Sequence, residues 1–258
     1  EGQQEKAAYE KCLLDILESV EKFIGRYAAE AEKAGNYQAA DLLRRVLSGK
    51  PETLLEALQL LRIIHYCLWC SFNYHNTLGR FDQYMYPFYE QDIREGRLTG
   101  ESALELLEEF FICLNKDSDL YTGMQQGDNG QSMVLGGRNP DGTESYNELS
   151  DLCLQASLEL KLIDPKINLR VNKNTPLSMY VKGTELTKQG LGFPQYSNDD
   201  VVIKGLRDLG YAPEDACNYP VAASWEFIIP GKGMEIPNID ALCFAREMRD
   251  AVVSSLMD

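Results

Sequence analysis

The sequence has little of what binds nucleic acids or crosses membranes. Its 258 residues carry 25 Lys and Arg against 40 Asp and Glu, for a formal net charge of −15. Such a chain repels phosphate backbones and anionic membrane surfaces, and it contains no basic patch to offset this repulsion. Arg62, His65 and glycines interrupt the apolar runs before they reach the length of a bilayer. We therefore expect neither a nucleic-acid partner nor a membrane span.

Metal-binding residue types are also scarce. The chain has two histidines, and of its seven cysteines only Cys67 and Cys70 form a Cys-x-x-Cys pair. A structural zinc site normally recruits two such pairs, and a thioredoxin-type pair opens a helix instead of lying within one. We interpret these residues as buried helical cysteines and expect no metal site. The odd number of scattered thiols favours a reducing, cytoplasmic environment.

Phosphate-binding loops and paired catalytic carboxylates are missing as well. The glycine-rich segment at 231–233 is followed by Met234, where a P-loop needs Ser or Thr. Tight turns explain the glycine clusters more simply. Asp199 and Asp200 are adjacent, so on a helix they point in different directions. We interpret them as a helix N-cap followed by a first-turn acid.

Helical periodicity dominates the first two thirds of the chain. Apolar residues recur at steps of three and four over residues 7–33, and Gly35 ends that helix. The helix predicted after Pro51 is apolar nearly all round, so we expect it to be deeply buried. Ser145 and Glu148 have the spacing of a capping box. Further helices are predicted over 37–47, 51–74, 101–115, 145–160, 176–188 and 199–209, and from an Asn238 cap to the end of the chain.

Short apolar runs bounded by turn residues predict buried strands at 131–135 and 167–171. Strands separated by helices indicate an α/β layer or barrel instead of a helical bundle. The apolar stretch 221–229 ends at Pro230, and prolines concentrate in this last quarter of the chain. We therefore expect a functional loop in this region.

The segment Ala223-Ser224-Trp225-Glu226 is the strongest candidate for chemistry. In an extended loop, a hydroxyl and a carboxylate two residues apart face the same side. A carboxylate in apolar surroundings can move a proton near neutral pH. The chain has no Gly-x-Ser-x-Gly elbow, and no histidine can be placed as a base. From the residues alone, Ser224 is therefore a loop serine or a weak hydrolase candidate.

Six segments in a fixed order carry a more specific signal. They read GRFDQYMYPFY (79–89), GQSMVLGG (130–137), NELSDLCLQA (147–156), INLRVNKNTP (167–176), GLGFPQYSND (190–199) and YAPEDACNYPVAASWEF (211–227). Several ordered motifs are far more specific than one short pattern. Over about residues 60–245 the chain resembles the glycyl radical enzymes, the pyruvate formate-lyase-like family.

The resemblance implies a fold and a reaction. We expect an α/β fold in which residues 1–258 form part of a ten-stranded barrel surrounded by helices, with a helix-rich N-terminal part. The implied reaction is radical C–C, C–N or C–O cleavage of a small polar substrate in an anaerobic, cytoplasmic setting. Its glycyl radical would be installed by an activating enzyme that uses S-adenosylmethionine and an iron-sulfur cluster. The implied assembly is a homodimer.

Two departures from the family motif bear on activity. The resemblance places Ser224 at the position of the radical cysteine and Glu226 at the position of the proton-transfer carboxylate. Neither Arg-Val pair, at 45–46 or at 170–171, is followed by the glycine of the glycyl radical motif. We therefore expect a truncated, inactive form that lacks the glycyl radical domain. Ser224 is either an engineered replacement or a natural loss, and the alternative function is a non-catalytic binding or scaffold protein.

The resemblance also suggests substrate-binding residues. His75 and Asn76 precede the segment 79–89, where dehydratase-type relatives place polar contacts, although both also suit a helix-end cap. Met133 lies mid-strand and is expected to face the barrel interior. Trp225 either lines the pocket or anchors the loop. We interpret Asp82 and Arg170 as structural charges in the barrel wall.

Overall fold

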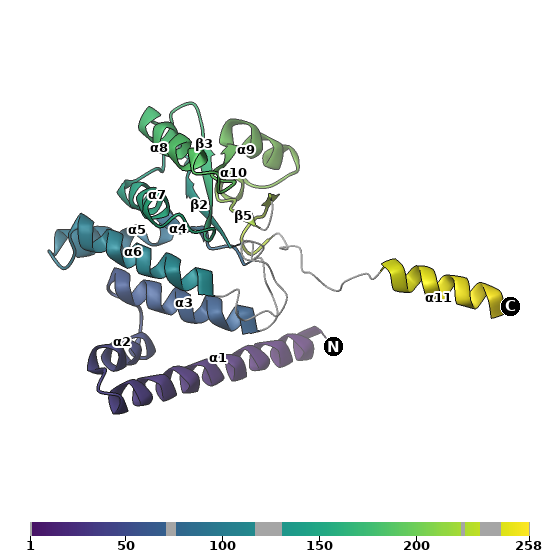
Figure 1. The fold of residues 1–258 in the computed structure, drawn as a ribbon, viewed down its shortest axis with the longest axis horizontal. Helices are drawn as coiled ribbons and strands as arrows, with labels where there is room; N and C mark the ends of the chain where they lie inside the picture. The colour runs from purple at the N-terminus through teal and green to yellow at the C-terminus, as the bar shows by residue number, and fades with distance from the viewer. Residues whose placement is uncertain (1, 71–75, 117–130, 223–224, 233–243, 258) are drawn as a thin grey trace.

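The computed structural model describes residues 2–70, 76–116, 131–222, 225–232 and 244–257 (Figure 1). It is a helix-rich α/β fold, as the sequence predicts. Its helices are α1 (Gly2–Lys33), α2 (Tyr37–Ser48), α3 (Leu54–Cys70), α4 (Phe81–Tyr84), α5 (Tyr86–Arg94), α6 (Gly100–Asn115), α7 (Glu148–Leu160), α8 (Leu177–Lys188), α9 (Asp199–Asp208), α10 (Pro213–Cys217) and α11 (Phe244–Met257). Its strands are β1 (Gly79–Arg80), β2 (Ser132–Gly136), β3 (Lys166–Val171), β4 (Gln195–Asn198), β5 (Val221–Ala222) and β6 (Glu226–Phe227).

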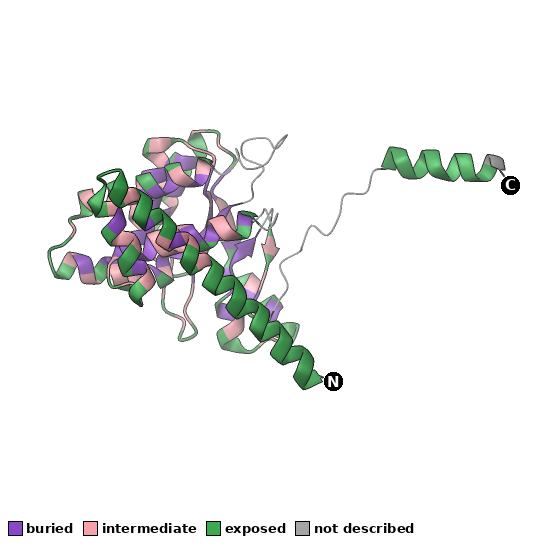
Figure 2. Cartoon of the chain, turned by 90° about the horizontal axis from the view of Figure 1, so that it is seen from below, coloured by how far each residue is buried: buried purple, intermediate pink, exposed green. Residues whose placement is uncertain are grey.

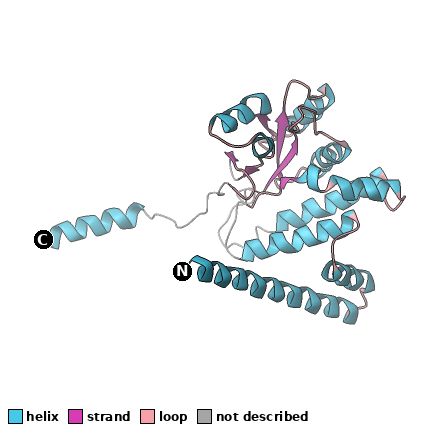
Figure 3. Ribbon diagram, turned by 180° about the vertical axis from the view of Figure 1, so that it is seen from behind, coloured by secondary structure: helices cyan, strands magenta, loops and turns pink. Residues whose placement is uncertain are grey.

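The first four strands form one parallel sheet in the order β1-β2-β3-β4. Figure 3 shows the strands gathered in one part of the fold, with helices around them. Val134 of β2 pairs with Asn168 of β3, which pairs with Gln195 of β4. Helices connect successive strands, as parallel pairing requires. β5 and β6 form a separate antiparallel pair.

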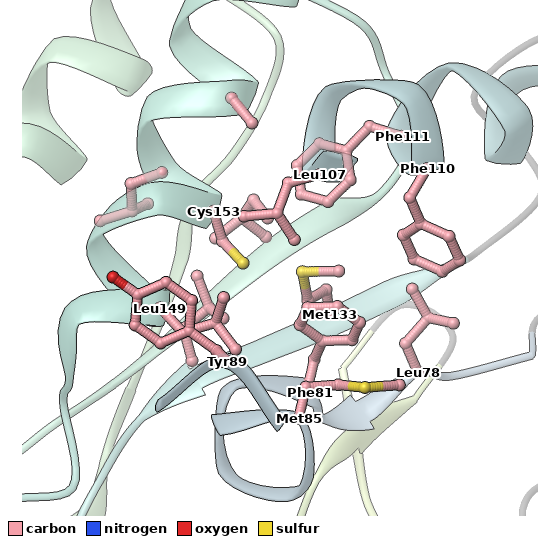
Figure 4. Close-up of a cluster of buried hydrophobic side chains, with 14 of the residues drawn as sticks. Leu78, Phe81, Met85, Tyr89, Leu107, Phe110, Phe111, Met133, Leu149 and Cys153 are labelled. Carbon is pink, nitrogen blue, oxygen red and sulfur yellow. The ribbon is translucent and has the colours of Figure 1, made fainter. Parts of the chain in front are cut away.

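Alternation along the strands gives the sheet two different faces. Met133, Leu135, Ile167 and Leu169 belong to the main hydrophobic cluster, together with side chains from α4, α6 and α7 (Figure 4). Val134 points the other way and packs with Tyr219 and Val221. The first face is therefore an apolar contact with helices, and the second carries the chain that leads into β5.

The caps of two helices differ from expectation. The N-cap of α7 is Asn147, whose side chain exchanges hydrogen bonds with Ser150 in a capping box. Ser145 does not cap this helix, because its hydroxyl donates to the Gly137 carbonyl at 2.9 Å. The N-cap of α9 is Asn198, whose side chain accepts a bond from the Asp200 amide. Asp199 lies one residue further on and is fully buried.

Two helices are less buried than their composition predicts. α3 buries Leu54, Leu58 and Trp69 but exposes Ile64 and Leu68, so only one side faces the core. α1 is exposed along its N-terminal half (Figure 2) and buries Ile24 and Ala28 near its end. In the described residues no helix is both long and apolar enough to cross a bilayer. The predicted Asn238 cap lies outside the described residues.

His65 is buried in α3, where it is 2% exposed and meets the edge of Trp69 at a ring separation of 6.1 Å. Burial, and after it the charge of Arg62, lowers the pKa of His65 to about 4. In the unfolded chain, His65 takes up a proton below its ordinary pKa of 6.5. Folding therefore favours the neutral imidazole.

The lowered pKa of His65 predicts how stability depends on pH. The contribution of His65 to the free energy of unfolding is complete above pH 6.5, and it is lost by about 1.4 kcal/mol per pH unit as the pH falls toward 4. Chemical denaturation between pH 5 and pH 7 measures it, with the His65→Gln variant as control. We expect a shallower pH slope in the variant. Equal slopes for the two proteins would contradict a buried neutral histidine.

Candidate functional site

The candidate site is built around residues 217–229, which we call the hairpin segment. Val221 pairs with Phe227 and Ala222 pairs with Glu226, so residues 223–225 connect two short antiparallel strands. The Ile228 amide also donates to the Pro220 carbonyl at 3.3 Å. This pairing brings the two ends of the predicted functional loop together. Residues 223 and 224 themselves lie outside the described residues.

A buried ion pair lies beside the entry to the hairpin segment. The Arg170 guanidinium donates two hydrogen bonds to the Asp199 carboxylate, at 2.9 and 2.8 Å, and both side chains have no solvent exposure. Burial on its own would lower the Arg170 pKa, but the hydrogen bonds and charge of Asp199 raise it above its usual value. Arg170 therefore stays charged.

Tyr219 links this ion pair to the hairpin segment. Its hydroxyl donates to Asp199 Oδ1 at 2.5 Å, and Arg170 donates to its backbone carbonyl at 3.0 Å. The guanidinium carbon also lies 4.0 Å from the centre of the tyrosine ring. Burial, with the neighbouring Asp199 carboxylate, raises the Tyr219 pKa, so its hydroxyl keeps its proton and acts as a donor.

Two further side chains donate hydrogen bonds to the hairpin segment, Arg80 on β1 and Thr77 just before β1. Arg80 donates to the Cys217 carbonyl at 3.3 Å and to the Ser145 hydroxyl at 3.0 Å. Burial, followed by repulsion from Arg170, lowers the Arg80 pKa to about 10, so it is cationic at neutral pH. Thr77 Oγ1 lies 2.8 Å from the Val221 carbonyl oxygen.

Asp82 and Arg170 are structural charges, as predicted. Asp82 Oδ2 accepts bonds from the Gly136 amide at 2.6 Å and from the Ser150 hydroxyl at 2.5 Å. Burial raises the Asp82 pKa. These bonds join α4 to the end of β2 and the start of α7. They fix the frame of the sheet and do not reach the hairpin segment.

The structure places some predicted site residues and leaves others undescribed. Ser224 and His75 lie outside the described residues. Glu226 is partly buried, and its Oε2 accepts a bond from the Trp225 amide at 3.0 Å. Trp225 is 48% exposed, and Asn76 is 3% exposed, one residue before Thr77. Thr77, the residue after Asn76, bonds the Val221 carbonyl on β5, and β5 pairs with β6, which holds Glu226. Asn76 and Glu226 therefore belong to one region of the fold.

Met133 lies elsewhere. It is fully buried in the main cluster, near Phe81, Leu107 and Phe110 (Figure 4). This is the sheet face covered by helices, because Val134 occupies the face toward the hairpin segment. The placement does not favour an interior, substrate-facing Met133, and its substrate-binding role stays a prediction.

Sequence reasoning missed the residues that hold the hairpin segment. Thr77 lies outside the six ordered segments, and Tyr219 lies within one of them without a predicted role. The sequence pattern at Asp199 predicts only a helix cap. The partners Arg170 and Asp199 are 29 residues apart, so no local pattern links them. Among the described residues, no group of three or more His, Cys, Asp or Glu side chains is arranged to hold a metal ion.

Comparison with known proteins identifies the family. The profile of the pyruvate formate lyase-like family matches residues 1–244, so the chain belongs to that family. It is 30% identical to (2S)-3-sulfopropanediol dehydratase of Klebsiella oxytoca over 246 residues, which cover 88% of this chain and 30% of the enzyme. It is 32% identical over 201 residues to trans-4-hydroxy-L-proline dehydratase of Clostridioides difficile, covering 72% and 25%.

Solved structures agree with this membership. A glycyl radical enzyme from Archaeoglobus fulgidus matches with a TM-score of 0.76 and 29% identity over 83% of this chain and 30% of that one. The glycerol-bound B12-independent glycerol dehydratase from Clostridium butyricum matches with a TM-score of 0.75 and 28% identity, over 83% and 29%. The parallel sheet and its helices therefore correspond to a portion of the glycyl radical enzyme fold. The chain spans about 30% of the length of these relatives.

The buried ion pair gives a direct prediction for stability. Asp199→Asn leaves the Arg170 charge buried without its counter-ion, which costs about 3–5 kcal/mol of unfolding free energy. Asp200→Asn is the matched control, because Asp200 is partly exposed and its pair with Arg138 spans 3.4 Å. A surface pair of this kind is worth less than about 1 kcal/mol. Urea denaturation of both variants measures the difference, and equal losses would contradict the special role of Asp199.

Proposed function

We propose that the hairpin segment is the counterpart of the loop that carries the radical-forming residue in glycyl radical enzymes. The observation that carries this proposal is the pairing of Ala222 with Glu226, because it brings together the chain before and after position 224 inside the family-matched region. The motif Ala223-Ser224-Trp225-Glu226 supports the same assignment. Ser224 then stands where active relatives have cysteine.

The serine decides what this chain can do. In the active family, a cysteine thiyl takes a hydrogen atom from a substrate C–H bond, which leaves a thiol and a carbon radical. A hydroxyl holds its hydrogen much more strongly than a thiol does, so a glycyl radical cannot readily convert Ser224 to an oxygen radical. Ser224 does not fit the radical chemistry of the family. The chain with this residue does not turn over by that route.

Glu226 is the proposed proton-transfer residue. It follows position 224 by two residues and lies on β6, directly across from Ala222. The Trp225 amide holds one carboxylate oxygen at 3.0 Å, which orients the side chain. Within the part of the chain that the structure describes, the second oxygen accepts no hydrogen bond. A positioned carboxylate can take or return the proton of a substrate hydroxyl or amine during bond cleavage.

The substrate class follows from the relatives. They include dehydratases of a sulfonated diol and of hydroxyproline, glycerol dehydratase and an isethionate sulfite-lyase. The substrates in these names are all small polar molecules that bear hydroxyl or charged groups. We propose a substrate of this class for the radical lyase lineage of this chain, with a radical-activating enzyme as its partner and a homodimer as its assembly. His75, Asn76 and Trp225 are the proposed substrate contacts, and the setting is cytoplasmic.

A binding or scaffold protein is the second candidate. Ser224 favours it, because a serine is close in size to a cysteine but does not supply the hydrogen-atom chemistry. Such a protein would hold a small polar ligand, or another protein, without converting it.

The decisive experiment restores the cysteine. Ser224→Cys is made in the full-length natural protein and treated with a radical-activating enzyme, S-adenosylmethionine and reductant under anaerobic conditions. We expect a glycyl radical signal in electron paramagnetic resonance and consumption of a substrate from a panel of glycerol, isethionate, trans-4-hydroxyproline and sulfopropanediol. The unsubstituted protein should consume none of them.

The control adds Glu226→Gln to the restored cysteine. Loss of a positioned acid-base group should lower turnover by about 10²- to 10⁴-fold while the radical signal persists. A radical signal without substrate consumption by the cysteine variant contradicts the lyase proposal. Failure to form any radical favours the binding or scaffold candidate.

A further inference from the structure

Three alternate backbone carbonyls in residues 217–221 each accept a hydrogen bond from a side chain of the sheet region. The donors and acceptors are Arg80 to Cys217 at 3.3 Å, Arg170 to Tyr219 at 3.0 Å, and Thr77 to Val221 at 2.8 Å. The side chains of Tyr219 and Val221 are themselves completely buried. This part of the hairpin segment is therefore held at every second residue.

The donors lie at different positions along the strands of the parallel sheet. Arg80 ends β1, whereas Thr77 precedes β1 and lies 3.2 Å from the carbonyl oxygen of Ser132, the first residue of β2. The hairpin segment therefore crosses this face from the carboxyl ends of the strands toward their amino ends. Among the described strands β5 pairs only with β6, so side chains, and not a strand ladder, attach it to the sheet.

The Thr77 hydroxyl can make only one donor bond, and the geometry assigns it to Val221. The Val221 oxygen is nearer than the Ser132 oxygen, at 2.8 against 3.2 Å. Ser132 already receives a bond from the Leu78 amide at 2.8 Å. The Gly79 amide donates to the same hydroxyl at 3.0 Å, which fixes its orientation. Without the hydroxyl, the buried Val221 carbonyl would lose this bond to the sheet region.

We propose that Thr77, together with the Arg170–Asp199 pair that holds Tyr219, positions the β5–β6 hairpin and with it Glu226 on β6. This inference rests on the proposed function for the role of Glu226, but its physical content is a set of attachments. Thr77 is a positioning residue, because it acts through Val221 and the pairing of β5 with β6. Tyr219 acts in the same way, through its hydroxyl bond to Asp199.

Hydrogen-deuterium exchange on the full chain tests the attachment at Thr77. Thr77→Val keeps the shape of the side chain and removes the hydroxyl, whereas Thr77→Ser keeps the hydroxyl. We expect T77V to speed amide exchange about tenfold in peptides covering residues 219–229, because those amides open locally once the anchor is lost. T77S should exchange at close to the original rate.

Thr175→Val is the matched control. The Thr175 hydroxyl also bridges two groups, accepting from the Asn172 amide at 2.9 Å and donating to Glu144 at 2.6 Å, away from the hairpin segment. Its loss should leave exchange in residues 219–229 unchanged. The proposal is overturned when T77V exchanges like the original protein, or when T175V accelerates these peptides equally. Should T77V not fold by circular dichroism, Tyr219→Phe replaces it with the same expectation and the same overturning result.

A second readout reports on position 224 itself. Ser224→Cys introduces a thiol whose alkylation by iodoacetamide is followed by mass spectrometry of its own peptide, so other cysteines do not interfere. T77V should raise this rate severalfold, and T77S should restore it. If T77V leaves the alkylation rate unchanged, the positioning role of Thr77 is overturned. Neither readout needs a radical, so failure here leaves the proposed chemistry standing, and failure of activation leaves the attachments standing.

Discussion

The buried pair of Arg170 and Asp199 is the interaction on which the candidate site depends. Two full charges without solvent exposure are tolerable only when nearly every donor and acceptor is used. Asp199 accepts from Arg170, from the Tyr219 hydroxyl and from the Arg138 amide at 2.6 Å. The third guanidinium nitrogen of Arg170, Nη1, donates to the Tyr219 carbonyl. The requirement to satisfy these charges therefore joins β3, the start of α9 and the entry to the hairpin segment.

The two faces of the sheet therefore have different roles. Ile167 and Leu169 point to the helices and supply apolar burial, whereas Arg170, next to Leu169, points to the opposite side and holds the hairpin segment. A period of two along one strand is enough to separate the two roles. The hydrophobic face provides most of the stability of the layer. The polar face provides geometry, because directional bonds fix where a loop lies better than apolar contact does.

Much of the fold follows from the sequence where the signal is local. The apolar period over residues 7–33 and the helix predicted over residues 101–115 correspond to α1 and α6, and the apolar run around Ile167 corresponds to β3. Short elements such as α4, α10 and β1 were missed because two to five residues give no measurable period. The Ser145 cap was wrong because that hydroxyl is bonded to Gly137 instead.

The candidate site was predictable only in part, for the same reason. The ordered motifs predicted the family, which the profile match over residues 1–244 confirmed. They also pointed to Ser224 and Glu226 as site residues, and that assignment stays a prediction. The attachments of Thr77, Tyr219 and Asp199 join residues from 20 to 144 positions apart, and their meaning exists only after folding. Asp199 shows this best. In the sequence it is an acid at a helix start, and in the structure it is the counter-ion of a buried arginine.

The central claim is that the ion pair holds the hairpin segment through Tyr219, and a double-mutant cycle tests it most directly. Unfolding free energies are measured for the original protein, for Asp199→Asn, for Tyr219→Phe and for the double variant. Coupling through the 2.5 Å bond predicts an interaction free energy of about 1–3 kcal/mol between the two sites. An interaction free energy indistinguishable from zero would contradict the account, because Tyr219 would then be packed beside the ion pair without being held by it.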